Sequence, residues 1–182
     1  ALAARQHESA DLVDRLSNVT VGAGMIVDRI VSKPGHKKAP VSQNIMKSDS
    51  LVSTEWLAQR LDAPDLRIVD GTYYLPVQNK NAHAEYLDRH IPGAVFFDID
   101  DIADKDTDLP HMLPSPEKFS SKVRKLGLGD GNRIVIYDSQ GMMSAARVWW
   151  TFRVFGHKDV AVLDGGLPKW LREGRPVEDR PP

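Results

Sequence analysis

The clearest chemical signal in this chain is a loop that begins at Asp138, between a strand pattern and a helix pattern. Residues 134–137 form a short apolar run of β-forming side chains, and Asp138-Ser-Gln-Gly-Met-Met follows as a loop. Residues 144–155 then predict a helix that ends at Gly156. A strand, a glycine-containing loop and a helix N-terminus direct backbone N–H groups and the positive end of the helix dipole toward one point. The sequence therefore predicts an anion-binding cradle with the carboxylate of Asp138 at its mouth.

Two roles are open for Asp138. It can be a nucleophile of the aspartyl-phosphate kind, or a structural carboxylate that accepts loop N–H groups and caps the following turn, which we favour. Arg147, one turn into the predicted helix, can bind an anionic substrate as a bidentate fork. It can instead make a structural contact at a domain interface or with Asp138, which we favour. Ser139 and Ser144 have no local histidine partner and no Gly-x-Ser-x-Gly motif, so we expect them to cap backbone groups.

Asp70 ends a second strand pattern, residues 66–70, at the carboxyl edge of the predicted sheet. Open α/β sheets bind ligands at that edge, so Asp70 is a candidate site residue. Hydrogen bonds to nearby amides would explain this position equally well. We interpret His90 and His111 as structural side chains. The histidine and acidic residues do not show the spacing of a metal site, and we expect no metal and no other cofactor.

A rival motif is Asp98-Ile-Asp100, which follows the apolar run Val95-Phe-Phe. An apolar strand followed by Asp-x-Asp is how haloacid-dehalogenase-type phosphatases begin, with the first aspartate as nucleophile and the pair holding Mg²⁺. That function also needs a second acidic pair after a later strand, and Gly129-Asp-Gly-Asn-Arg-Ile does not supply it. An Asp-nucleophile phosphatase is therefore a remote alternative.

The segments that must position these residues alternate between strand and helix patterns. Short apolar runs predict strands, and N-capping residues such as Ser53 and Ser115 predict helix starts. The predicted strands are residues 66–70, 94–97, 134–137 and 160–163. The predicted helices begin at Ser53 or Thr54 and span residues 82–90, 115–126, 144–155 and 167–172. Short apolar strands separated by helices indicate an α/β fold, with a central parallel sheet and helices on both faces.

Composition limits the classes of function. The chain has 182 residues, of which 41% are hydrophobic and 27% charged, as is usual for a globular protein. A net charge of −1 gives no reason to expect nucleic-acid or membrane binding, and no apolar run is long enough to span a bilayer. Cysteine is absent, which excludes disulfides and thiol chemistry within this chain. No secretory signal pattern is visible, so we expect a cytoplasmic protein.

The first 50 residues differ from the rest. Residues 1–31 form an N-terminal extension in which two β-type runs flank a short turn, as in a hairpin. Residues 9–31 resemble the C-terminal hairpin of the sulfate adenylyltransferase large subunit, and an arbitrary extension is equally compatible with the pattern. Residues 32–50 are rich in proline, lysine and serine and are predicted to be a linker.

Five blocks further along the chain carry a family resemblance. The blocks are Ile91-Pro-Gly-Ala-Val-Phe-Phe-Asp-Ile-Asp, Leu109-Pro-His-Met-Leu-Pro, Ser144-Ala-Ala-Arg-Val-Trp-Trp, Arg153-Val-Phe-Gly-His and Leu163-Asp-Gly-Gly-Leu-Pro-Lys-Trp. In order and spacing they resemble the first half of the two-domain rhodanese family, the 3-mercaptopyruvate/thiosulfate sulfurtransferases. The resemblance implies a rhodanese-like fold for residues 51–178, with residues 179–182 beginning an interdomain linker.

In that family the first domain is non-catalytic and the reactive cysteine lies in the second. The resemblance implies that this chain is the first domain of an enzyme moving sulfane sulfur from 3-mercaptopyruvate or thiosulfate to cyanide or thiol acceptors. It places Asp138 where the family has its cysteine, and it makes Asp70 face the partner domain's cysteine across a shared cleft. The implied partners are that second rhodanese domain and small sulfur-donor substrates, and we expect this chain alone to be inactive. The alternative is a stand-alone, inactive rhodanese-like binding or regulatory module.

Overall fold

The central sheet consists of five parallel strands in the computed structural model, which describes residues 50–180. The spatial order is β1 (Leu51–Val52), β5 (Val160–Leu163), β4 (Arg133–Tyr137), β2 (Leu66–Asp70) and β3 (Ala94–Phe96). Every neighbouring pair is hydrogen-bonded in parallel, and Asp70 lies opposite Tyr137 where β2 pairs with β4. The predicted α/β fold with a central parallel sheet is confirmed.

Both faces of this sheet are buried, which explains why its strands read as nearly continuous apolar runs. In β4, Ile134 and Ile136 belong to one hydrophobic core, whereas Val135 and Tyr137 belong to another. Successive side chains of a strand point to opposite faces, so each face of the sheet has its own core. Asp138, the first residue after β4, leaves the sheet at its carboxyl edge.

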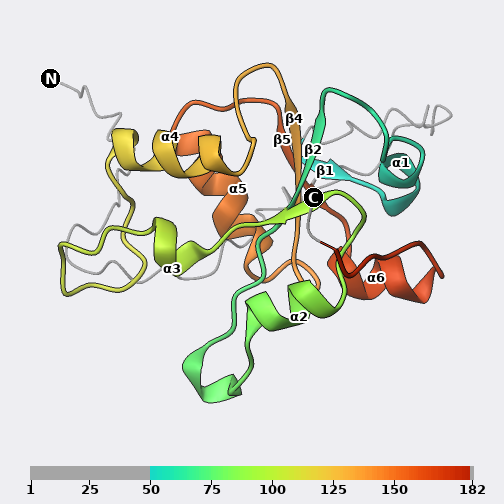
Figure 1. Ribbon diagram of the computed structural model, residues 1–182, viewed down its shortest axis with the longest axis horizontal. Coiled ribbons are helices and arrows are strands. Elements are labelled where there is room, and N and C mark those ends of the chain that lie inside the picture. Colours follow the sequence, from blue (N-terminus) through green and yellow to red (C-terminus); the bar gives the residue numbers. More distant parts are fainter. Residues whose placement is uncertain (1–49, 181–182) are drawn as a thin grey trace, which may run out of the picture. The chain divides into compact units, whose positions relative to one another are not determined.

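Helices cover both faces, as Figure 1 shows. The helices that contribute to the core of Ile134 are α3 (Ile99–Ile102), α4 (Pro116–Lys125) and α5 (Ala145–Val154). The helices that contribute to the core of Val135 are α1 (Thr54–Ala58) and α6 (Gly166–Arg172). A further helix, α2 (Ala82–Asp88), is tied to β3 because the hydroxyl of Tyr86 donates a hydrogen bond to Ala94 O, at 2.7 Å.

Local signals set the helix boundaries largely where the sequence predicted them. Ser53 is the N-cap of α1 and accepts from the Trp56 N–H at 3.1 Å. Ser115 is the N-cap of α4 and accepts from the Lys118 N–H at 3.2 Å. Both bonds satisfy donors that the first helical turn leaves without intrahelical partners. Gly127, with φ +72°, follows the C-cap of α4, which is the conformation that favours glycine.

Three short elements were not predicted: β1, α3 and the 3₁₀ turn η1 (Pro76–Gln78). β1 has two residues and forms because it pairs with β5, far away in the sequence. α3 begins at Asp98, whose carboxylate accepts from the Asp100 and Asp101 N–H groups at 3.0 Å each. Asp98 is thus engaged as a helix N-cap, which does not favour the nucleophile role of the phosphatase motif.

The spacing of Trp149, Trp150, Phe152 and Phe155 predicts a helix that is apolar and buried all round, and this prediction is wrong for one face of α5. Phe152 is buried, and the half-buried Trp149 donates its indole N–H to Val160 O at 2.9 Å. Trp150 and Val154, however, are 41% and 47% exposed. Because these two residues lie four positions apart, they share one outward face of the helix. The exposed part of α5 therefore carries two large apolar side chains beside the exposed Arg153.

The possible hairpin in residues 1–31 and the linker in residues 32–50 lie outside the described residues, apart from Ser50. Their boundaries, and those of residues 51–178 as a domain, stay predictions. Within residues 50–180, no helix has the length and apolar character needed to cross a bilayer.

Candidate functional site

The loop after β4 closes around the side chain of its own first residue. Asp138 is fully buried, and its Oδ1 accepts hydrogen bonds from the Gln140 and Met142 N–H groups at 2.9 and 3.0 Å. Its Oδ2 accepts from the N–H of Ala145, the first residue of α5, at 2.8 Å. The predicted amide cradle is present, and the anion that it holds is the carboxylate of Asp138. Such hydrogen bonds to a charged acceptor are about twice as strong as neutral ones.

The N-terminus of α6 covers this loop at very short range. The N–H of Leu167 donates to Asp138 O at 2.9 Å, and an added Cβ on Gly166 would lie 2.5 Å from the same oxygen. Gly166 also has φ +55°, where side-chain-bearing residues are strained. The resulting seal leaves no accessible surface on Asp138 for a substrate.

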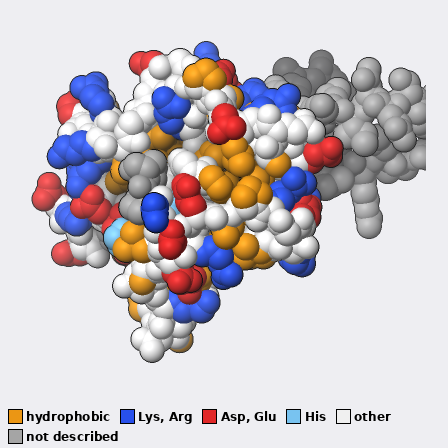
Figure 2. Space-filling view, turned by 45° about the vertical axis from the view of Figure 1, so that its right-hand side comes forward, with side chains coloured by type: hydrophobic (Ala, Val, Ile, Leu, Met, Phe, Trp, Pro, Cys, Tyr) orange, Lys and Arg blue, Asp and Glu red, His pale blue; other side chains and the backbone are white. Residues whose placement is uncertain are grey.

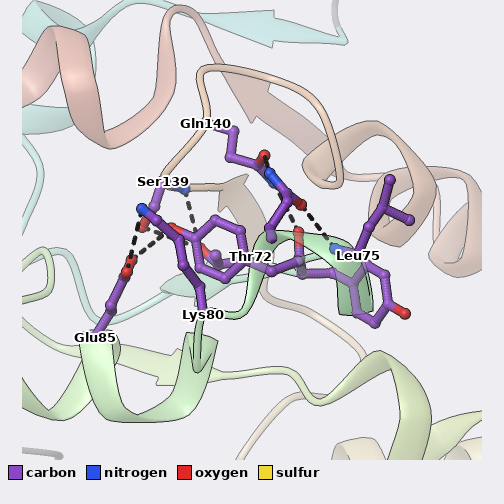
Figure 3. A network of polar contacts seen from close by, with 9 residues as sticks. Thr72, Leu75, Lys80, Glu85, Ser139 and Gln140 are labelled. Atoms are coloured by element: carbon purple, nitrogen blue, oxygen red, sulfur yellow. Dashed lines mark hydrogen bonds and ion pairs between the residues drawn. The ribbon is translucent and has the colours of Figure 1, made fainter.

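Hydrogen bonds join the loop after β2 to the loop after β4 (Figure 3). The Ser139 N–H donates to Thr72 Oγ1 at 3.0 Å, and the Tyr73 N–H donates to Ser144 Oγ at 3.1 Å. The Gln140 side-chain amide donates to Tyr73 O at 2.7 Å. Ser144 precedes α5 but makes no side-chain capping bond to that helix, and its hydroxyl accepts from the backbone of the other loop instead. The hydroxyl of Ser139 is hydrogen-bonded to the Thr72 hydroxyl at 3.2 Å. These contacts fix the two loops as one unit.

Asp70 is the last residue of β2, directly before the first of these two loops. It is 1% exposed, and its Oδ1 accepts from the N–H and the hydroxyl of Thr72 at 2.9 and 2.5 Å. The hydroxyl of Tyr137 also donates to this carboxyl group. Burial raises the pKa of Asp70, the bonds from Thr72 and Tyr137 oppose that change, and the charge of Asp138 adds to it. Asp70 can therefore act on a neighbouring cleft only through the residues that it holds in place.

Arg147 makes contacts away from the carboxylate of Asp138. Its guanidinium donates to His111 O and lies over the ring of Trp150, 4.9 Å from the ring centroid. The adjacent hollow, lined by Arg147 and His111, has a volume of about 10 Å³. Such a volume has room for about one water molecule, so this hollow is too small for an organic substrate. The expected ion pair with Asp138 is absent among the described contacts, and the contact with His111 O favours a structural role.

The structure also places Asp100, His111 and Tyr73 together, a group that sequence reasoning missed. Nδ1 of His111 lies 2.8 Å from Asp100 Oδ1, and its Nε2 lies 3.3 Å from the hydroxyl of Tyr73. A carboxylate beside Nδ1 keeps a proton on that nitrogen, which leaves Nε2 as an acceptor. Partial burial, and then the charge of Asp100, raise the pKa of the Tyr73 phenol. This arrangement is one that can hold or move a proton.

A wider hollow lies beside Ser139. It has a volume of about 430 Å³ and is lined by apolar residues of α6, including Leu167 and Leu171, and by charged residues before and within α2. Lys80 pairs with Glu85 at 3.4 Å, so the charges on that wall offset one another. Within residues 50–180, no group of three or more histidine, aspartate or glutamate side chains is arranged to hold a metal ion.

Apolar side chains are exposed on the two joined loops as well as on α5. Leu75, Val77 and Met143 are 48%, 87% and 61% exposed. On the face of the molecule that Figure 2 shows, hydrophobic side chains also gather in one area, with charged side chains near it. Large apolar side chains that gather on a surface are typical of a binding face for another protein or domain.

Comparison with known proteins gives a family match. The family described as "Rhodanese-like domain" matches residues 53–173. The Arabidopsis thaliana protein named "Thiosulfate/3-mercaptopyruvate sulfurtransferase 1, mitochondrial" is 47% identical over 149 residues, which cover 82% of this chain and 38% of that protein. Human 3-mercaptopyruvate sulfurtransferase is 47% identical over 134 residues, which cover 70% of this chain and 45% of that protein.

Solved structures agree with this match. The crystal structure of SseA from Escherichia coli, described as a 3-mercaptopyruvate sulfotransferase with the "Rhodanese" fold, aligns with a TM-score of 0.70 and 41% identity. That alignment covers 72% of this chain and 51% of SseA. The chain thus spans about half or less of the length of these relatives.

Proposed function

Because the chain belongs to the rhodanese-like domain family, we propose that it is the non-catalytic N-terminal domain of a sulfurtransferase. The complete enzyme would move sulfane sulfur from 3-mercaptopyruvate or thiosulfate, the donors named for its relatives, to cyanide or a thiol. One observation carries the proposal: the amide cradle after β4 is filled and sealed by the Asp138 carboxylate, in a chain without cysteine.

The chemistry explains why this cradle cannot transfer sulfur. A thiolate attacks the sulfane sulfur of the donor, an S–S bond forms, and the donor leaves with the electron pair of its broken bond to sulfur. The carboxylate of Asp138 cannot form a persulfide, and both of its oxygens already accept N–H groups. The reactive cysteine therefore belongs to a second domain, which is consistent with relatives of which the matched part makes up only about half or less.

This domain would contribute proton handling and positioning to a cleft shared with that partner. The Asp100 carboxylate orients His111 so that Nε2 can accept a proton, and Arg147 anchors the backbone at His111 O. The phenol of Tyr73 is protonated at neutral pH, since its pKa is raised further above the ordinary value of about 10. Asp70 would act as a positioning residue that holds Thr72, and through it the joined loops.

The exposed apolar side chains favour the hypothesis that a partner domain covers them over the hypothesis of a stand-alone module. Leu75, Val77 and Met143 on the joined loops, and Trp150 and Val154 on α5, remain accessible. An independent binding module has less need to leave such side chains uncovered. A cytoplasmic location stays a prediction, and the printed name of one relative assigns that relative to mitochondria.

The test is sulfur transfer to cyanide from 3-mercaptopyruvate and, separately, from thiosulfate. We expect no turnover by the purified chain alone, and turnover by a protein in which the second domain is present. A cysteine-to-serine change in that second domain is the matched control and should abolish the activity. Turnover by this cysteine-free chain alone would refute the proposal.

A further inference from the structure

The segment after α6 folds back onto the turn that precedes β3. His90 and Glu178 form a two-way backbone bridge, with each N–H donating to the other residue's carbonyl at 2.9 Å. The carboxylate of Glu178 also accepts from the Gly93 N–H at 2.6 Å. The indole of Trp170 donates to Pro176 O at 2.7 Å, which holds the start of this segment against α6.

The imidazole of His90 is fully buried beneath this contact. Its Nδ1 lies 2.6 Å from Tyr86 O, and because a carbonyl can only accept, Nδ1 carries a proton. Its Nε2 lies 3.5 Å from Glu178 Oε1 and has no hydrogen-bond partner in residues 50–180. In neutral His90, therefore, the lone pair of Nε2 faces a carboxylate. In protonated His90, an N–H faces the same carboxylate.

We propose that His90 and Glu178 form a proton-dependent latch, which holds the segment after α6 against residues 90–93 and closes more tightly when His90 is protonated. Protonation replaces a buried, unpartnered nitrogen with a charge-assisted contact. The latch therefore tightens as the pH falls from about 8 through the range in which histidine ordinarily titrates. Opening the segment separates the imidazole from the Glu178 carboxylate and removes this contact.

The neighbouring tyrosines do not change charge in the pH range of the latch, so the imidazole of His90 is the group that takes up the proton. Tyr86, from α2, stacks on His90 with ring centroids 4.2 Å apart, and burial raises its pKa to about 12. Tyr137, from β4, accepts from the Ile91 N–H, and burial raises its pKa well above the ordinary value. Asp70, from β2, is bonded to that tyrosine. Both phenols are uncharged between about pH 5 and 8, the range in which histidine ordinarily titrates.

The latch would fix the point at which the chain leaves this domain. In a two-domain sulfurtransferase, a consequence that rests on the proposed function, it would set the direction of the segment leading to the second domain. The latch itself depends only on contacts within the described residues. A failure of the latch and a failure of the proposed function can therefore be distinguished, because the following test uses no activity measurement.

The test is amide hydrogen exchange, followed by NMR on the 182-residue chain. At about pH 5.5 and about pH 8, either side of the ordinary histidine pKa, exchange rates are divided by the intrinsic rate at each pH. We expect the protection of the Gly93 and Glu178 amides to be at least about threefold greater at the lower pH, because the contact with protonated His90 then resists opening. Equal protection at both values would overturn the proposal.

Two variants and one direct observation complete the experiment. Glu178→Gln keeps an oxygen for the Gly93 N–H but removes the negative charge, so it should abolish the pH response. Glu173→Gln changes a carboxylate that bonds Thr54 and Arg175, so the pH response should remain. The ¹⁵N shifts of the His90 ring should show that Nε2 gains the proton at the lower pH. A ring that stays neutral, or a response that survives in Glu178→Gln, would overturn the latch.

Discussion

Replacing Asp138 with alanine should cost much of the stability of this domain. The substitution removes an acceptor of three backbone N–H groups, from Gln140, Met142 and Ala145. A hydrogen bond to a charged group contributes about 1.5–3 kcal/mol, and a buried donor left unpaired costs about 1–3 kcal/mol. Because the three bonds share one carboxylate, their contributions do not add fully. We expect Asp138→Ala to lower the free energy of unfolding by about 3–5 kcal/mol, from a total that is typically about 5–15 kcal/mol.

Urea unfolding, followed by tryptophan fluorescence and far-ultraviolet circular dichroism, measures this loss. Asp138→Asn should fall between wild type and Asp138→Ala, because an amide keeps one acceptor oxygen but turns an NH₂ group toward a donor. The matched control is Asp164→Ala, at the aspartate that directly follows β5. Asp164 is exposed and pairs with Lys169 at 2.5 Å, so its loss should cost less than about 1 kcal/mol.

The outcome that refutes this reasoning is a loss below about 1 kcal/mol for Asp138→Ala, the range of a surface contact. Water would then be satisfying the Gln140, Met142 and Ala145 N–H groups, and the loop would not depend on an internal anion. A changed slope of free energy against urea would instead mean that the folded or unfolded state had changed in compactness, and the two values could not be compared.

Three further predictions concern the close contact at Gly166, proton transfer by His111 and the buried carboxyl group of Asp70. Gly166→Ala should lower the unfolding free energy by more than about 2 kcal/mol, because the new Cβ meets Asp138 O in a left-handed backbone. Gly174→Ala, with φ +66° and open space around the new Cβ, should cost only about 1–2 kcal/mol, and equal losses would argue against the close contact. In the two-domain protein, His111→Gln should slow sulfur transfer at least about tenfold with little change in the unfolding midpoint, and an unchanged rate would exclude proton transfer by His111. Because burial raises the pKa of Asp70, the folded state binds its proton more tightly than the unfolded chain, so stability falls as the pH rises above 3.8. Asp70→Asn should flatten that fall in unfolding curves, and an identical slope in both proteins would contradict this reasoning.

The sequence predicted those parts of the fold that depend on local patterns. β2 and β5 have the expected boundaries, because strands buried on both faces leave an uninterrupted apolar run. Ser115 fixed the start of α4 through a bond to the next turn. β1 was missed because its two residues become a strand only through pairing with β5. The outward face of α5 was misjudged because a tryptophan at a helical spacing does not reveal whether anything covers it.

The candidate site was predictable only where its contacts are local. The cradle at Asp138 was expected because the carboxylate and its donors lie within one loop and the start of one helix. The hydrogen bond between Thr72 and Ser139 joins the loops after two different strands, so no local sequence pattern predicts it. The pairing of Asp100 with His111 likewise depends on how the segment after α3 folds back. Arg147 was placed correctly on its helix, but its partner, the carbonyl of His111, is a backbone group that any residue could offer.

The cradle after β4 shows how one geometry can support either stability or reactivity. N–H groups that converge on one point stabilise an anion whatever its source, so the same loop can lower the energy of a thiolate or hold a fixed carboxylate. When the anion is Asp138, the favourable energy is used within the folded state, and α6 can close over it because no substrate has to enter. A cysteine at this position would need an open mouth and therefore a less tightly packed Gly166. On this reasoning, a thiol placed here without reopening the seal would not give sulfur transfer, which agrees with the proposal that the reactive centre lies in a partner domain.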